Sequence, residues 1–353
     1  MIKSLKIKNF KQFKDFEIND LTLVNLISGK NNVGKSSLLE ALFLLIDHSN
    51  PEVFLKLNNF RKSESFTDVT IWESIFHNFN SDNIIRIQAK NNNDELEISY
   101  CKDNTFVPVN NHNIENTMFN NFKSSAKMNY SLKYDFKSNN YKETNNIIIG
   151  KDGFLTNPQT SEKDNEIKNI CMIYMENYDT ARSDRIMLDW LGKIEKNNSK
   201  NEVIEFLNLI DLNIVDVMII TDNTIPRLYI KLKNNSMFPI EFMGDGIRKL
   251  LHLYLAIKVK EYDIVLIDEI ENGLHYSMYE VLWKYIYKLA KDRNCQIIAT
   301  THSYENIAAL QSVLSKKDDM AYFRLGKNDD KITAHRFSAE MLNEAISLNM
   351  EVR

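Results

Sequence analysis

The sequence predicts an α/β fold in which a mostly parallel sheet has helices on both faces, joined to an N-terminal antiparallel β lobe and a helical/β insertion. Three observations predict this fold. A buried strand at residues 21–28 leads through a glycine loop into a helix. Strands and helices alternate after residue 246, which is typical of a parallel sheet covered on both sides. The stretch of about 50–240 is less regular and contains half-exposed strands.

The first fifty residues contain the elements that frame a loop. Two short strands are expected at 2–8 and 12–18, around the turn NFKQ. The run LTLVNLIS (21–28) is apolar enough for a buried strand and is followed by Gly29, and SSLLEALFLLI (36–46) has the apolar face of a helix. A strand, a glycine loop and a helix in this order are the context that a phosphate loop requires.

The middle of the chain alternates between patterned segments and segments rich in Asn, Asp, Ser and Lys. Strands are expected at 85–90, 95–101 and 131–136, and the segments VDVMIITD and RLYIKLK continue the strand pattern. Helices are expected at 185–196 and 201–210, and loops at 102–127 and 137–165. No sustained heptads occur, so we expect no long coiled-coil arm.

The last third alternates regularly between helices and strands. We expect helices at 246–260 and 279–292, strands at 263–269 and 295–302, a closing hairpin from MAYFRLGK and KITAHRF, and a terminal helix from AEMLNEAISL. The expected domains are one core, formed by 1–49 and 240–353, and a second region, 50–239, that holds the β lobe and a mainly helical insertion serving as a partner or oligomer surface.

Composition excludes several classes of protein. The chain has 353 residues, 43% hydrophobic and 26% charged, with a net charge of −4, which is ordinary for a globular protein and gives no global attraction to nucleic acid. Three widely spaced cysteines without a CxxC pair argue against a disulfide framework or a zinc site. No signal peptide and no run of about 20 apolar residues is present, so we expect a cytoplasmic protein without membrane contact.

A complete phosphate-loop motif, GKNNVGKSS, begins at Gly29. Its glycines let the backbone amides face phosphates, Lys35 brings a charge to the β and γ oxygens, and Ser36 offers a hydroxyl to Mg²⁺. We expect these residues to bind the nucleotide: Gly29, Lys30, Asn31, Asn32, Gly34, Lys35, Ser36 and Ser37. The alternative, a chance glycine-rich turn, does not explain a full motif at a strand-to-helix junction.

A carboxylate pair follows a buried strand in DIVLIDEIENGLH (263–275). Ligands of a parallel sheet lie at the carboxyl ends of its strands, where Asp268 and Glu269 are expected. Asp268 suits a Mg²⁺ ligand and Glu269 suits the base that orients an attacking water. His302 ends the next strand and is expected to reach the γ-phosphate or the water. The alternative for Asp268 and Glu269 is a pair that only ends a strand in solvent, and the alternative for His302 is a solvated histidine without a role.

A second anion-binding helix start appears in MGDGIRKLL (243–251). Gly244 and Gly246 leave backbone amides bare in front of a helix, where the helix dipole favours negative charge. The alternative is an ordinary helix cap formed by Asp245. The chain therefore has two predicted anion-binding sites. Because one nucleotide needs only one phosphate loop, the second site needs a separate explanation.

The sequence resembles the ABC-type ATPases of the SMC, Rad50 and OLD group and, more narrowly, the AAA15 family of bacterial ATPases. The matching segments are IKNFKQFKDFEI, LTLVNLISGKNNVGKSSLLEALF, FMGDGIRKLL, IVLIDEIENGLHYSMYEVLW, IIATTHS and NEAISLNMEVR. The resemblance implies the fold of an ABC-type P-loop ATPase head that hydrolyses ATP with Mg²⁺. Lys35, Glu269 and His302 would be the catalytic residues, and Ser36 and Asp268 would hold the metal.

The same resemblance implies a homo-oligomer, at least a dimer, in which ATP is held between two heads. Gly244, Asp245 and Gly246 stand where the signature loop of this group touches the γ-phosphate of the opposite head. This loop lacks the usual serine, which Arg248 or Lys249 would replace. Residues 270–275 occupy the position of the D-loop, and Gln88 is a candidate for the Q-loop glutamine, whose position the resemblance does not fix.

The resemblance also indicates a biological setting. OLD nucleases carry a TOPRIM domain after the ATPase, and no matching set of metal-binding acids is found here. We therefore expect a nucleotide-dependent sensor and scaffold in bacterial anti-phage defence, similar to PARIS-type and Septu-type ATPase subunits. Its partner would be a separate effector, such as a TOPRIM or HNH nuclease or a toxin.

Two other functions stay open at this point. The first is a DNA-repair or maintenance head of SMC/Rad50 type; a lysine stripe on the first two strands makes DNA a candidate partner, although lysines also protect an edge strand from aggregation. The stripe consists of Lys3, Lys6, Lys8, Lys11 and Lys14. The second is the nucleotide-binding subunit of a transporter, against which the long irregular insert argues.

Overall fold

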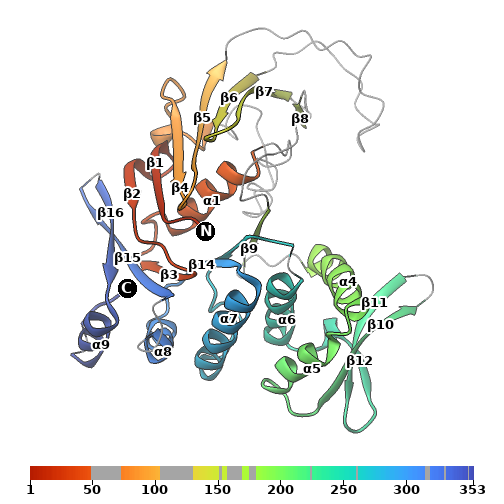
Figure 1. Ribbon diagram of the computed structural model, residues 1–353. Helices are drawn as coiled ribbons and strands as arrows, with labels where there is room; N and C mark the ends of the chain where they lie inside the picture. Colours follow the sequence, from red (N-terminus) through yellow and green to blue (C-terminus); the bar gives the residue numbers. More distant parts are fainter. Residues whose placement is uncertain are drawn as a thin grey trace, which may run out of the picture.

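The structure is a computed structural model, and eleven segments of the chain are described. They are 1–48, 73–103, 130–150, 153–156, 169–174, 180–222, 225–259, 261–314, 319–329, 331–348 and 350–353. Within these segments the strands form three sheets, of six, seven and three strands, and the larger two lie one above the other with a helix between them (Figure 1). Among the described residues, no helix is long and apolar enough to cross a membrane.

The six-stranded sheet has the strand order β16-β15-β3-β14-β13-β9. Its strands are β3 (Val24–Gly29), β9 (Ile170–Tyr174), β13 (Ile264–Asp268), β14 (Gln296–Thr300), β15 (Met320–Asn328) and β16 (Lys331–Phe337). All neighbours pair in parallel except β15 and β16, which form the closing hairpin. The predicted mostly parallel sheet is therefore confirmed.

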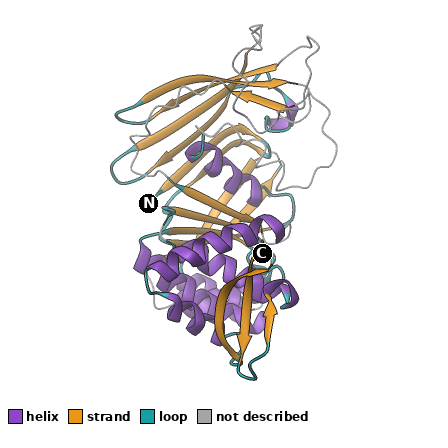
Figure 2. Cartoon of the chain, turned by 90° about the vertical axis from the view of Figure 1, so that its right-hand side faces the viewer, coloured by secondary structure: helices purple, strands orange, loops and turns teal. Residues whose placement is uncertain are grey.

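Helices cover both faces of this sheet, as expected. Leu266 and Ile298 face α1 (Lys35–Ile46), whereas Val265 and Ile297 face the opposite layer, because side chains alternate along a strand. The opposite layer contains α6 (Asp245–Lys258), α7 (Tyr279–Arg293), α8 (Tyr304–Leu314) and α9 (Ala339–Ser347). Figure 1 shows these helices below the sheet and α1 above it, and Figure 2 shows the same layers from the side.

The seven-stranded antiparallel sheet lies over α1 and has the strand order β2-β1-β4-β5-β6-β7-β8. Its strands are β1 (Ser4–Phe10), β2 (Phe13–Ile18), β4 (Ile85–Lys90), β5 (Glu95–Asp103), β6 (Tyr130–Lys137), β7 (Lys142–Gly150) and β8 (Gly153–Thr156). The apolar face of this sheet and α1 share one core. The expected N-terminal β lobe is therefore present, and residues near the chain start and residues beyond 84 build it together.

Three sequence predictions need correction. The expected loop at 137–165 contains β7 and β8, because β6 supplies a full ladder for a segment whose Asn residues disfavour strands on their own. β9 pairs with β13, so Ile170–Tyr174 belongs to the six-stranded sheet although 50–239 was assigned outside the core. Helix α8 was not predicted; its buried apolar residues are Ile307, Leu310 and Val313. Residues 104–127 and 157–165 lie outside the described residues.

The insertion packs against α6. Its elements are α4 (Thr180–Lys196), α5 (Lys200–Asn208) and the three-stranded sheet of β10 (Ile214–Asp222), β11 (Ile225–Leu232) and β12 (Met237–Pro239). Phe206 of α5 stacks on Tyr254 of α6, with ring centroids 4.3 Å apart. The side chain of Asp184 in α4 binds Arg248 of α6, and the Arg248 side chain is buried. Short 3-10 helices occur at His77–Phe79, Ile240–Phe242 and Tyr276–Met278.

An ion pair joins the β lobe to α1. The Lys11 ammonium, in the turn between β1 and β2, lies 2.5 Å from a carboxylate oxygen of Glu40, which is fully buried in α1. Of the lysine stripe, Lys6 and Lys8 also face acids, Glu17 and Asp15, across the hairpin. Three of the five stripe lysines, Lys6, Lys8 and Lys11, therefore lie opposite carboxylates.

Replacing Glu40 should destabilise the fold. Glu40→Ala leaves the Lys11 ammonium without its carboxylate in a nearly buried position, so the free energy of unfolding should fall by about 3 kcal/mol. Chemical denaturation measures this change. The matched control is Glu17→Ala, which removes an exposed partner of Lys6 and should cost less than about 1 kcal/mol. Equal losses in the two variants would show that the buried pair does not hold the lobe.

His252 should make stability depend on pH. The ring stacks on Trp190 at 5.3 Å, and burial lowers the pKa of His252 from 6.5 to about 4. As the pH falls, His252 therefore takes up a proton in the unfolded chain before it does so in the folded protein. The free energy of unfolding has its full value above pH 6.5 and falls by about 3 kcal/mol toward pH 4. Urea denaturation at pH 7 and pH 4 measures how much the free energy of unfolding falls between these two values. For His252→Phe this fall should be about 3 kcal/mol smaller than for the wild type, whereas for His335→Phe, at an exposed position, it should equal that of the wild type.

Candidate nucleotide-binding and hydrolytic site

The site lies where three parallel strands end at one edge of the six-stranded sheet. Thr300 of β14 pairs with Ile27 of β3, and Ala299 pairs with Ile267 of β13. This register places Gly29, Thr300 and Asp268 side by side at the carboxyl edge, although more than 230 residues separate the first from the last in sequence. In an open α/β sheet this edge is where ligands bind.

The phosphate loop is shaped by close packing under its second glycine. Gly34 has a φ of 100° and caps α1 without a side-chain hydrogen bond, so the first amides of the helix are not used by a capping group. A Cβ at Gly34 would lie 2.9 Å from the Phe13 ring, which leaves no room for a side chain. Lys30, Asn31 and Asn32 are exposed on the open side of the loop. The loop can therefore present bare amides to an anion.

Lys35 reaches into this loop. Its ammonium donates hydrogen bonds to the carbonyl oxygens of Gly29 at 2.7 Å and Lys30 at 3.2 Å. Burial lowers the pKa of Lys35, and the nearby carboxylates of Asp268 and Glu269 oppose that change. The structure thus brings Lys35 together with both predicted acids, in the place where phosphate oxygens would meet it.

Asp268 and Ser36 form the pair expected to hold a metal. The Asp268 carboxylate accepts a 2.6 Å hydrogen bond from the Thr300 hydroxyl, and the Ser36 hydroxyl also hydrogen-bonds to it. Burial raises the pKa of Asp268, and these hydrogen bonds act against the rise. A hydroxyl and a carboxylate are oxygen ligands that suit Mg²⁺. The described residues contain no cluster of three or more His, Cys, Asp or Glu able to hold a metal alone, so phosphate oxygens would have to complete the shell.

The side chain of Glu269 points in a different direction from that of Asp268. Its backbone is left-handed, with a φ of 53°, and its N–H donates to the Thr300 hydroxyl oxygen at 2.9 Å. One threonine therefore holds both acids. The Asp268 side chain is turned inward, whereas the Glu269 side chain is 26% exposed at the edge. A partly solvated carboxylate beside the loop is placed to accept a proton from water.

His302 is near Glu269 but is bound by another acid. Its Nδ1 lies 3.9 Å from Glu269 and 3.0 Å from a carboxylate oxygen of Glu271, which also accepts the His302 backbone N–H at 2.7 Å. Sequence analysis missed Glu271. The available signal was a second acid two residues after Glu269, in a loop that follows the strand.

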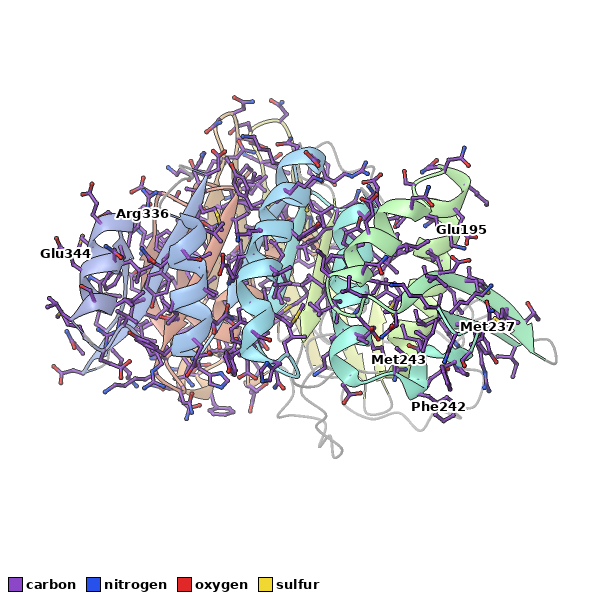
Figure 3. All side chains as sticks on the ribbon, turned by 90° about the horizontal axis from the view of Figure 1, so that it is seen from below. Glu195, Met237, Phe242, Met243, Arg336 and Glu344 are labelled. Carbon is purple, nitrogen blue, oxygen red and sulfur yellow. The ribbon has the colours of Figure 1, made fainter. Side chains whose placement is uncertain are left out.

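The second glycine pair begins α6, on the opposite face of the sheet from α1 (Figure 1). Gly244 is the N-cap and has no side-chain hydrogen bond, so Asp245 is not the cap and lies in the first turn. Gly244 and Asp245 are exposed. Phe242, just before them, is 77% exposed and lies with Met243 near Met237 in Figure 3. This helix start is therefore open to another molecule.

Two residues proposed to replace the missing serine are already engaged. Arg248 is buried with Asp184, so it cannot reach a second subunit without breaking that pair. Lys249 donates to the backbone oxygen of Asn272 at 3.4 Å, and a Cβ at Gly246 would lie 3.0 Å from the Gly273 oxygen. The pair with Asp184 therefore argues against the expectation for Arg248. The beginning of α6 instead packs on residues 270–275 of its own chain.

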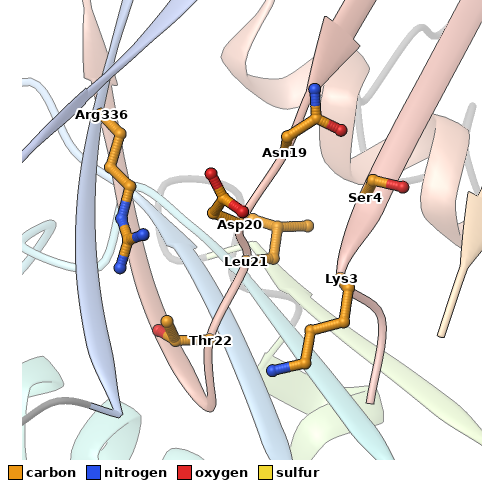
Figure 4. Close-up of a pocket in the computed structure, with 7 residues that line it drawn as sticks. All are labelled: Lys3, Ser4, Asn19, Asp20, Leu21, Thr22 and Arg336. Carbon is orange, nitrogen blue, oxygen red and sulfur yellow. The ribbon is translucent and has the colours of Figure 1, made fainter. Parts of the chain in front are cut away.

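Two other features lie away from this edge. Gln88 binds Glu97 across β4 and β5, and this cross-strand pairing in the antiparallel sheet does not support its assignment as the Q-loop residue. An open cavity of about 500 Å³ is lined in part by Lys3, Thr22 and Arg336 (Figure 4). It lies where β3 begins, at the end of that strand opposite to the phosphate loop, so it is not part of the site.

Comparison with known sequences assigns this geometry to a family. Residues 1–307 match AAA_15, an AAA ATPase domain. The chain belongs to this family. As an AAA_15 protein it is an ATPase, which confirms the activity predicted from the phosphate loop and the carboxylate strand.

Individual relatives agree with this assignment. The AAA_15 chain is 30% identical to an ATP/GTP phosphatase of Helicobacter pylori over 367 residues, covering 97% of each protein. It is 38% identical over 65 residues to a DNA double-strand break repair Rad50 ATPase of Archaeoglobus fulgidus, covering 18% of this chain and 7% of that protein. A solved SMC head bound to the C-winged helix domain of ScpA matches with a TM-score of 0.52 at 15% identity, covering 96% of this chain and 98% of that one, which shows a shared fold.

Lys35 should be required for nucleotide binding. Because Lys35→Ala removes the only charge that points into the loop from α1, the Kd for ATP should rise about 100-fold, or about 3 kcal/mol. Titration with a fluorescent ATP analogue measures the Kd. Lys14→Ala, on an exposed face of β2, is the control and should change the Kd less than twofold. A similar Kd for both variants would remove Lys35 from the site.

Proposed function

We propose that this AAA_15 ATPase binds ATP with Mg²⁺ between two copies of the chain and acts in the cytoplasm as a nucleotide-dependent sensor and scaffold. The observation that carries the proposal is the arrangement of the two helix starts. α1 and α6 lie on opposite faces of one sheet, and their N-termini are at the same carboxyl edge, so each start can offer its amides to an anion.

Within one head, different residues would bind the phosphates, the metal and the attacking water. The amides of Gly29 to Ser37 and the Lys35 ammonium would hold the phosphates, while Ser36 and Asp268 would hold Mg²⁺. The metal would neutralise charge on the phosphate oxygens. Glu269 would accept a proton from the attacking water, because it is the acid that faces the open edge. His302, beside Glu269, would contact the γ-phosphate.

The second head would complete the pocket. Gly244, Asp245 and Gly246 begin a helix of 14 residues, whose dipole favours negative charge at this exposed end. Because α6 lies across the sheet from the phosphate loop of its own chain, the γ-phosphate that it meets would belong to the partner. Release of phosphate would then weaken the dimer, so the oligomeric state would report the nucleotide state.

The biological role follows from the family resemblance and not from the site. We place the protein in anti-phage defence, where it would restrain or release a separate effector such as a TOPRIM or HNH nuclease. The segment 50–239, apart from β9, would provide the partner surface. The relative named ATP/GTP phosphatase adds GTP as a second candidate substrate.

A DNA-maintenance role is the alternative, and the local match to a Rad50 ATPase favours it. The pairing of Lys6, Lys8 and Lys11 with acids argues against a cationic DNA surface on β1 and β2. Binding to duplex DNA that requires ATP and weakens steeply with salt would support this alternative.

Glu269→Gln should separate binding from hydrolysis. Loss of the base should lower kcat about 100-fold or more while ATP still binds, so the ATP-bound dimer should accumulate. Phosphate release measures kcat, and light scattering after size exclusion measures mass with and without ATP.

Glu280→Gln, on the exposed side of α7, is the matched control and should behave as the wild type. A Glu269→Gln variant that hydrolyses ATP at the normal rate would show that the base is wrongly assigned. A monomer at every nucleotide concentration would rule out the shared pocket.

A further inference from the structure

A buried carboxylate lies behind the candidate site and has no place in the roles given above. The Glu271 side chain is 6% exposed, whereas the neighbouring Glu269 side chain is 26% exposed. A buried carboxylate is costly unless several donors satisfy it. The groups that satisfy Glu271 therefore indicate what it is for.

Two N–H groups donate to Glu271, and the His302 ring lies close to the same carboxylate. One carboxylate oxygen accepts the His302 backbone N–H at 2.7 Å and lies 3.0 Å from the His302 Nδ1. The other oxygen accepts from the Asn306 amide at 3.4 Å. Glu271 thus accepts a hydrogen bond from the His302 main chain and is in close contact with its ring.

The support continues into the core. Asn306 is fully buried, and its side-chain oxygen accepts a 2.7 Å hydrogen bond from the indole of Trp283, which is also fully buried in α7. This bond fixes the orientation of the Asn306 amide, so the amide must donate toward Glu271. The chain Trp283, Asn306, Glu271 and His302 therefore runs from the rigid core to the edge of the site.

His302 needs such support because its ring is 51% exposed. An exposed side chain samples several rotamers, and holding one of them costs conformational entropy at the moment of reaction. Glu269, at 3.9 Å, is too far from the ring to hold it by a hydrogen bond. Glu271 is the group that can hold the ring beforehand.

We propose that Glu271 is a positioning residue, which holds His302 in the orientation used toward the γ-phosphate and ties it to residues 270–275. The inference rests on the proposed role of His302 in hydrolysis. The same loop contacts the start of α6, where Lys249 donates to the Asn272 backbone oxygen and Gly246 packs on Gly273. His302 and the glycine loop of α6 are thereby connected through one short segment.

Kinetics of Glu271→Gln provide the first test. Glutamine keeps the size and one acceptor oxygen but loses the charge, and its amide would face the fixed Asn306 amide, so His302 should be less well held. We expect kcat to fall about tenfold and the KM for ATP to stay within twofold. Glu305→Gln, an exposed acid in the first turn of α8 that accepts from Ser303, is the matched control and should leave both constants unchanged.

A double-mutant cycle separates positioning from general damage. If Glu271 acts through His302, the Glu271→Gln and His302→Ala double variant should have the kcat of His302→Ala alone, within twofold. If instead the kcat of the double variant falls by the product of the two single losses, the inference is overturned and the role of His302 stays intact. An unchanged kcat in His302→Ala would instead overturn the role of His302, and with it the inference.

NMR spectroscopy gives a readout that does not depend on turnover. The ring signal of His302, one of seven histidines, can be assigned by its absence in His302→Ala. In Glu271→Gln this signal should move and sharpen toward the position of a solvated histidine, while it should stay in place in Glu305→Gln. An unmoved signal would overturn the inference even if kcat fell.

Discussion

The parallel pairing of β3, β14 and β13 is the constraint on which the rest of the site depends. It aligns three strand ends, so that a glycine loop, a threonine and a carboxylate pair from distant parts of the sequence meet at one edge. Thr300 uses this alignment twice, since its hydroxyl donates to Asp268 and accepts from the Glu269 backbone. A shift of one residue in this register would direct each of these side chains to the other face.

The two sheets give the phosphate loop its rigidity. Helix α1 lies between them, with Phe13 packed under Gly34 and Lys11 bound to Glu40. The antiparallel sheet therefore covers α1 and is attached to it through these two contacts. The loop can keep its amides bare because packing, and not a side-chain cap, sets the beginning of the helix.

Much of this was predictable from the sequence, because the phosphate loop and the Asp-Glu strand are local motifs with a fixed structural context. The order of strands and helices in the last third was predictable for the same reason, since its apolar periodicity is strong. β7 and β9 were missed because both depend on pairing with another strand, β6 and β13, and the sequence does not indicate that pairing. Glu271 and the Arg248–Asp184 pair were missed because side-chain partners 31 and 64 residues apart leave no local pattern.

The contact between Arg248 and Asp184 has a consequence for how this chain can be divided. The guanidinium belongs to the nucleotide-binding half and its counter-charge to the insertion, and both are largely shielded from water. A minimal fragment made by cutting out α4 would leave that cation without compensation inside the protein. The insertion is therefore an integral part of the catalytic half, and a shortened relative would have to replace the arginine as well.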